Sequence, residues 1–207
     1  MKSKYPVRFD VDYPKELDRL TTFFRIFMAI PILIVIGLLS GGYSGSFSGD
    51  TWQVSGAFGA IIVLPTVLLI LFRGKYPRWW YDWNLELSRF AMRVNTYLSL
   101  LRDEYPSTDE QQAVHLDIDY PNVGKDLSQG MPLIKWLLAI PHYIVLLFLA
   151  IAAFFAVIIA WFAILFTGRY PKALFDFVVG VHRWALRVGG YAFLLVTDEY
   201  PPFSLEP

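Results

Sequence analysis

Two short acidic motifs hold the residues that are most able to do chemistry. Asp10 and Asp12 alternate with apolar residues ahead of Tyr-Pro, and Asp117 and Asp119 stand in the same pattern farther along the chain. Such alternation is typical of a half-buried strand, so each pair of carboxylates is predicted to share the polar face of one strand. Paired carboxylates could hold a hard cation, form ion pairs with basic side chains, or face solvent as an acidic edge.

Arginines on two later segments are the partners that we expect for these aspartates. They stand four residues apart in each segment, as Arg89 and Arg93, and as Arg183 and Arg187. We favour ion pairs that hold the strands to helices. A calcium site needs about six or more oxygen ligands and usually a glycine-containing loop, which Asp-x-Asp-Tyr-Pro lacks. The sequence therefore predicts no metal and no cofactor.

Other catalytic patterns do not occur in the sequence. It contains no cysteine, which excludes thiolate catalysis and disulfide bonds. We find no serine–histidine–aspartate arrangement, zinc-protease motif or glycine-rich phosphate loop. With 18 basic and 18 acidic side chains the net charge is zero, which gives no sign of a nucleic acid partner. We expect that the protein is not an enzyme.

The elements that position these residues occur twice. Phe-Arg-Gly-Lys-Tyr-Pro at 72–77 returns as Phe-Thr-Gly-Arg-Tyr-Pro at 166–171, and Asp-Glu-Tyr-Pro at 103–106 returns at 198–201. Repetition over most of a chain is typical of an internal duplication. The predicted organisation is a first repeat at 1–106, a linker at 107–113, a second repeat at 114–201 and a tail at 202–207.

Composition predicts an integral membrane protein. Hydrophobic residues make up 56% of the chain and the mean hydropathy is +0.44, against roughly 45–50% apolar residues in soluble domains. Each repeat contains a long apolar stretch, at about 21–72 and about 131–166, which we expect to form a hairpin of two transmembrane helices. The second stretch exceeds one crossing, so its turn is placed at 150–154. A shallow hairpin that does not cross the membrane is the alternative.

The first apolar stretch has two further features. A glycine- and serine-rich loop is predicted at 40–50, and Arg25 is expected to extend toward the lipid headgroups. A cleaved signal peptide is the competing interpretation. We favour a retained helix, because the stretch follows a strand and its duplicate lies in mid-chain. All lysines and arginines lie outside the 40–50 loop, so the positive-inside rule predicts that both termini are cytoplasmic in a multi-pass protein.

An amphipathic helix is predicted after each hairpin, at about 77–101 and about 171–195, because apolar residues recur there at three- and four-residue spacing. Tryptophans near the start of the first helix indicate that it lies in the membrane interface. Packing of its apolar face on the other repeat is the alternative. The candidates for contact with lipid phosphates or the interface are Lys75, Tyr76, Trp79, Trp80, Trp83, Arg169 and Tyr170.

The turns before these helices also have a simpler explanation. A helix-to-helix corner needs a left-handed residue, which Gly74 and Gly168 can supply, and it requires no ligand. After the helices, 97–106 and 191–201 are predicted to be strands or extended segments that pair with the two acidic strands.

The order of these motifs resembles a family of small bacterial membrane proteins known only as a domain of unknown function. The residues that carry the resemblance are Phe-Thr-Gly-Arg-Tyr-Pro at 166–171, the Arg183 and Arg187 helix, and the Asp-Glu-Tyr-Pro end. The first copy departs from this pattern at 72–75 and in its 40–50 loop. The resemblance implies a location in the bacterial inner membrane, and it implies no activity, cofactor or catalytic residue.

The expected fold is all-α with small β elements: four transmembrane helices in two tandem hairpins, two interfacial helices and short cytoplasmic strands. We expect membrane lipids, other membrane subunits or a second copy of the chain as partners. A non-catalytic accessory or scaffold subunit is the favoured function. A small transporter, channel or lipid-handling protein is the alternative, and an enzyme that uses the aspartate pairs is a third class.

Overall fold

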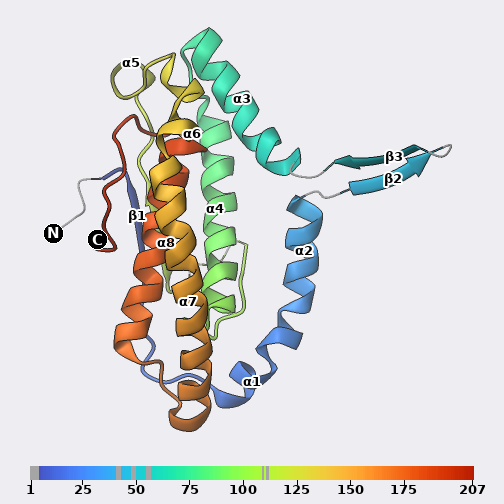
Figure 1. Ribbon diagram of the computed structural model, residues 1–207, viewed down its shortest axis with the longest axis vertical. Helices are drawn as coiled ribbons and strands as arrows, with labels where there is room; N and C mark the ends of the chain where they lie inside the picture. The colour runs from blue at the N-terminus through green and yellow to red at the C-terminus, as the bar shows by residue number, and fades with distance from the viewer. Residues whose placement is uncertain (1–4, 41–42, 48–49, 55–56, 109, 111) are drawn as a thin grey trace.

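The structure is a computed structural model that describes residues 5–40, 43–47, 50–54, 57–108, 110 and 112–207 (Figure 1). For residues 36, 38–40, 43–47, 50–54, 57–62, 125 and 126 it describes the backbone alone. The elements follow one another as β1 (Val7–Val11), α1 (Arg19–Met28), α2 (Ile30–Ser40), β2 (Tyr43–Phe47), β3 (Asp50–Val54), α3 (Ala57–Arg73), α4 (Arg78–Leu98), β4 (Val114–Ile118), α5 (Val123–Asp126), the 3-10 helix η1 (Met131–Leu133), α6 (Lys135–Leu138), α7 (Ile140–Thr167) and α8 (Lys172–Ala192).

β1 and β4 pair with each other in an antiparallel sheet. The register places Phe9 opposite Leu116 and Asp10 opposite His115. Val7, Phe9 and Leu116 are buried, whereas Asp10 and His115 are exposed. The buried face packs on α8 and α4, so the acidic face points away from the helices.

Three layers lie side by side, because α8 has β1 on one flank and α7 on the other (Figure 1). Three contacts join the β1 side of the protein to α8. Phe175 packs on Tyr13 near the start of the helix, and Arg183 donates to the carbonyl of Phe9 at its middle. Near the end of the helix, Gly190 faces Val7. β1 and the segment that follows it to Tyr13 therefore lie along α8 from Gly190 to Phe175. α7 runs antiparallel to α8, and the C-terminus lies on the β1 side (Figure 1).

Only α7, among the residues that the structure describes, is long and apolar enough to cross a membrane. The prediction of four transmembrane helices is therefore wrong. The expected hairpin at 131–166 is instead η1, α6 and the single 28-residue helix α7. The sequence at 150–154 is Ala-Ile-Ala-Ala-Phe, which contains no glycine or proline, so nothing ends the helix there. Pro141 lies in the first turn of α7, where proline is well tolerated.

The other predicted hairpin, at 21–72, does not begin with one long transmembrane helix. α1 has 10 residues and α2 has 11, and each is shorter than the roughly 20 residues that a crossing needs. The predicted loop at 40–50 contains β2, and β2 pairs antiparallel with β3. Tyrosine, phenylalanine, threonine, tryptophan and valine in these segments favour strands over an irregular loop. A multi-pass arrangement is not supported.

The closing segments at 97–106 and 191–201 do not form strands. α4 continues to Leu98 and α8 to Ala192, and the residues that follow are irregular. Leu100 and Leu195 have positive φ values of 62° and 58°, which turn the chain away from the helix axis. β1 and β4 consequently pair with each other, and the closing segments are left to contact α1 and α6.

Candidate functional site

Two helix arginines reach the strands by the same contact. Arg183 donates from Nε to the carbonyl of Phe9 at 2.8 Å, and Arg89 donates from Nε to the carbonyl of Leu116 at 3.0 Å. A terminal nitrogen of each arginine lies near an aspartate, at 3.2 Å from Asp10 and 3.5 Å from Asp117. Each helix therefore binds the strand that lies in the other half of the chain.

The carboxylates in these contacts are mostly in solvent. The side chains of Asp10 and Asp117 are 74% and 68% exposed, so these ion pairs stabilise the fold by less than about 1 kcal/mol each. The guanidinium of Arg183 is buried against the Phe9 carbonyl. The main contribution of Arg183 to the sheet–helix contact is thus its bond to the backbone.

Asp12 and Asp119 do not reach the helix arginines. Asp12 lies 3.1 Å from Nε2 of His115, and Asp119 accepts two hydrogen bonds from Arg8, at 2.6 and 2.7 Å. Both contacts cross the strand pair on its exposed face. Among the described residues, no three His, Asp or Glu side chains gather closely enough to hold a metal ion.

Arg93 and Arg187 bind main-chain carbonyls. Arg93 donates to the carbonyl of Ser107 at 2.7 Å, and Arg187 donates to the carbonyl of Glu206 at 2.8 Å. The first contact fixes the start of the 107–113 segment against α4. The second fixes the C-terminal tail against α8.

The turn tyrosines lie inside the protein. Tyr76 donates to the carbonyl of Leu194 at 2.9 Å, and Tyr170 donates to the carbonyl of Ser99 at 3.5 Å. Both tyrosines are buried, and burial raises the pKa of each hydroxyl. Neither side chain is placed to meet lipid headgroups.

The remaining candidates in the turns are accessible. Lys75 and Arg169 are exposed, and Gly74 and Gly168 have the left-handed φ values of 55° and 73° that the turns need. The tryptophans at the start of α4 form one aromatic group. Trp79 is 69% exposed, and Trp80 stacks on Trp83 and donates its indole N–H to Thr66.

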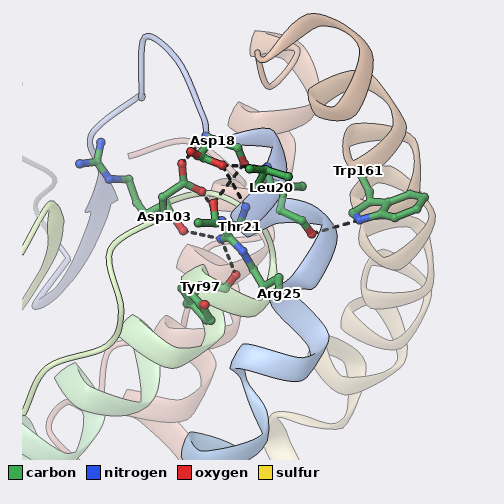
Figure 2. Close-up of polar contacts among 9 residues, drawn as sticks. Asp18, Leu20, Thr21, Arg25, Tyr97, Asp103 and Trp161 are labelled. Atoms are coloured by element: carbon green, nitrogen blue, oxygen red, sulfur yellow. Dashed lines mark hydrogen bonds and ion pairs between the residues drawn. The ribbon is translucent and has the colours of Figure 1, made fainter.

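Two cations lie buried in the protein, one that the sequence analysis placed at the headgroups and one that it did not single out. Arg25 is only 2% exposed, although it was expected to extend toward headgroups. Its guanidinium pairs with Asp103, donates to the carbonyl of Tyr97 at 3.0 Å and lies over the Tyr97 ring (Figure 2). The backbone N–H of Asp18, the N-cap of α1, donates to the same carboxylate at 2.7 Å.

Lys135 makes the matching contact in the second half of the chain. It is fully buried, with Nζ 2.6 Å from Oδ1 of Asp198 and 2.7 Å from the carbonyl of Thr197. Its ammonium lies over the ring of Tyr191, and the backbone N–H of Ser128 donates to Asp198. Burial lowers the pKa of Lys135, and the contact with Asp198 offsets part of that effect.

A sequence signal for this pair of contacts does exist. Arg25 and Lys135 are 110 residues apart, as are Pro31 and Pro141, and both acids belong to the repeated Asp-Glu-Tyr-Pro motif. The predicted apolar stretch at about 131–166 contains Lys135 near its start, and the sequence analysis did not single it out. The repeated acid motif therefore anchors a cation near the start of each apolar segment.

Comparison with protein families gives a match to the second half of the chain. A family described as a domain of unknown function (DUF4389) matches residues 132–204, which include α6, α7, α8 and the Asp198 motif. The match does not extend to the first copy of the motifs. No curated protein and no solved structure matches the chain. Residues 132–204 therefore match a domain of unknown function (DUF4389), and they contain the second-copy motifs that carry the resemblance.

Proposed function

We propose that the protein is a non-catalytic accessory or scaffold subunit that attaches to the bacterial inner membrane along one apolar side. The observation that carries the proposal is a difference in polarity between two opposite flanks of the molecule. The sheet flank exposes Asp10, Asp117 and Asp119. The opposite flank exposes large apolar side chains from α7, namely Ile144, Leu147, Phe148, Ile151, Phe154, Phe155, Ile159, Phe162 and Phe166.

This apolar surface exceeds what a soluble monomer normally exposes. α1 adds Phe23, Ile26 and Phe27 to the exposed residues of α7 with which it packs. Contiguous apolar patches of more than a few hundred Å² mark contacts with lipid or with another protein. A scaffold is supported because the rest of the protein is joined by hydrogen bonds and ion pairs between distant segments. Arg25, Lys135, Arg183 and the turn tyrosines make these contacts.

The layers also indicate how α7 meets the membrane. Asp10 pairs with Arg183 of α8, and the next residue, Trp184, donates its indole N–H to His142 in the first turn of α7, so the exposed Asp10 lies beside the first part of α7 rather than beyond its end. A crossing α7 would draw the packed α8 and β1, with the exposed Asp10, toward the hydrocarbon, where a charged side chain costs about 2.5 kcal/mol or more. We infer that α7 lies along the membrane surface with its exposed face in the lipid.

Single spin labels can test this orientation, because the chain has no native cysteine. Cysteines at Ile144, Ile151, Phe155 and Phe162 place labels along one exposed face of α7. Depth in liposomes is measured from relaxation by oxygen and by a water-soluble nickel complex. An interfacial helix gives similar shallow depths at all positions, whereas a crossing helix gives a maximum near Phe155 and shallow values at both ends. A label at Asp10 is the control and must remain accessible to the nickel complex.

The accessory role has its own test. The tagged protein is extracted from its native membrane in mild detergent, and native mass spectrometry counts the proteins and lipids that stay bound. A protein partner at fixed stoichiometry is the expected result. A lone monomer or homodimer that carries only lipid would contradict the accessory role.

Lipid handling is the second candidate function. It is favoured by a cavity between α1 and α7 on the apolar flank, which has a volume of about 310 Å³. The size is at the lower end of the range for small-molecule sites, roughly 300–1,000 Å³.

A further inference from the structure

The two turn glycines meet different neighbours. A Cβ at Gly168 would lie 3.6 Å from Nε of Arg19, whereas a Cβ at Gly74 would lie 3.0 Å from Nε2 of Gln129. Arg19 and Gln129 are 110 residues apart, which is the spacing that also relates the two buried cations. Each half of the chain therefore sets this residue against the turn of the other half, and only Arg19 carries a charge.

The turn between α7 and α8 consequently holds two arginines. Arg169 directly follows Gly168, and Arg19 lies against the same glycine. The backbone N–H of Leu17 donates to the carbonyl of Gly168 at 2.9 Å, which fixes the segment before α1 against this turn. Both arginines are exposed. They stand at one end of the molecule, where α1 begins and α7 ends (Figure 1).

Neither arginine forms an ion pair with a carboxylate in the part of the chain that the structure describes. Nearby acids have other partners, since Asp103 pairs with Arg25 and Asp176 with the lysine four residues before it. Asp18 caps α1, and the exposed Glu16 pairs with neither arginine. Neighbouring cations repel each other, and a shared anion removes this repulsion. Guanidinium groups bind phosphate oxygens through two parallel hydrogen bonds.

Exposed apolar side chains stand beside both arginines. Leu20 follows Arg19 and is 71% exposed, and Phe166 lies three residues before Arg169 and is 78% exposed. Both belong to the apolar side that α1 and α7 form. A surface that joins cations to apolar side chains fits the boundary of a bilayer, where phosphates lie above the hydrocarbon. A soluble phosphate would leave Leu20 and Phe166 in water, so the source that fits is a lipid.

We propose that Arg19 and Arg169 together bind the phosphate of an anionic phospholipid at the end of the apolar side. The inference rests on the proposed attachment of α7 to the membrane, and it adds the headgroup that the attachment selects. A headgroup with net negative charge is favoured over a zwitterionic one, because two cations without acidic partners meet one phosphate and no competing ammonium group.

Quenching by brominated phospholipids tests this selection. On the full-length protein, Phe162→Cys carries a fluorophore on the exposed face of α7, one turn before Phe166. The protein is reconstituted in phosphatidylcholine vesicles with rising fractions of brominated phosphatidylglycerol or brominated phosphatidylcholine. The two quenching curves give the preference for the anionic lipid at this end of α7. We expect phosphatidylglycerol to be preferred by more than about fivefold, the factor that one basic side chain contributes near an anionic surface.

The outcomes separate this inference from the attachment itself. Equal quenching by the two lipids would overturn the phosphate site and would still support contact of α7 with lipid. Quenching by neither lipid would overturn both the site and the attachment.

Variants test whether the two arginines make the selection. Arg19→Gln introduces the residue found at position 129, and it should lower the preference about fivefold, as should Arg169→Gln. Lys75→Gln is the matched control, because it removes one exposed charge from the matching turn before α4, at the opposite end of the molecule (Figure 1). It should leave the preference unchanged. An equal fall for Lys75→Gln and Arg19→Gln would show a general effect of net charge and would refute the site.

Discussion

Nζ of Lys135 lies 2.6 Å from Oδ1 of Asp198, and the lysine is fully buried while the aspartate is partly exposed. This asymmetry means that the two partners contribute differently to stability. Asp198→Asn removes the charge that pairs with the buried ammonium of Lys135, which still donates to the carbonyl of Thr197. The substitution should lower the free energy of unfolding by about 3 kcal/mol or more. Lys135→Met leaves a carboxylate that reaches water, and should cost roughly 1–2 kcal/mol.

Urea unfolding of the purified protein in detergent measures these differences. Lys172→Met is the matched control, because Lys172 pairs with Asp176 at 2.5 Å on the surface, where both side chains are more than half exposed. It should change stability by less than about 0.5 kcal/mol. If Asp198→Asn is no more costly than the control, the buried pair does not stabilise the fold.

The neighbouring glycines of α8 provide a second prediction. A Cβ at Gly190 would lie 2.6 Å from Cγ2 of Val7, whereas a Cβ at Gly189 meets nothing within 4 Å. Gly190→Ala should push β1 away from α8 and destabilise the protein by about 1–3 kcal/mol. Gly189→Ala should stabilise it by about 0.5–1 kcal/mol, because alanine favours the helix. The two melting temperatures should move in opposite directions, and a parallel shift would contradict the close contact between β1 and α8.

Arg183 and Asp10 give a third prediction. If the bond from Arg183 to the Phe9 carbonyl is the main contact, Arg183→Met should cost about 2 kcal/mol, and Asp10→Asn less than about 0.5 kcal/mol. A double-mutant cycle on urea unfolding gives the coupling between the two side chains. A coupling above about 1 kcal/mol would show instead that the ion pair itself holds the sheet to the helix.

His182 makes stability depend on pH. Burial lowers the pKa of this imidazole below its usual 6.5, and its hydrogen bond to the carbonyl of Val178 offsets only part of that effect. Below about pH 6.5 the unfolded chain therefore binds more protons than the folded protein, so stability falls as the pH falls. His182→Ser, which introduces the residue found at position 88, should lose less stability between pH 7 and pH 5.5 than the natural protein. Equal losses would exclude His182 as a source of the pH dependence.

Local patterns in the sequence determined several features. Alternation at 7–12 and 114–119 corresponds to β1 and β4, and apolar spacing corresponds to α4 and α8, because side-chain periodicity is a property of each element alone. The glycines of the two turns adopt positive φ, since other residues rarely take that conformation. The resemblance to a domain of unknown function is confirmed for residues 132–204.

Only the tertiary structure decided which residues meet. An apolar run without breakers is compatible with one helix or two, and contacts with α8 and α1 accompany the single helix α7. Arg25 and Asp103 are 78 residues apart, and no local rule pairs them. The same holds for Tyr76, which looked like a headgroup ligand and lies inside the protein. Periodicity fixes which face of an element is apolar, whereas the partner of that face depends on contacts between distant segments, which local spacing does not encode.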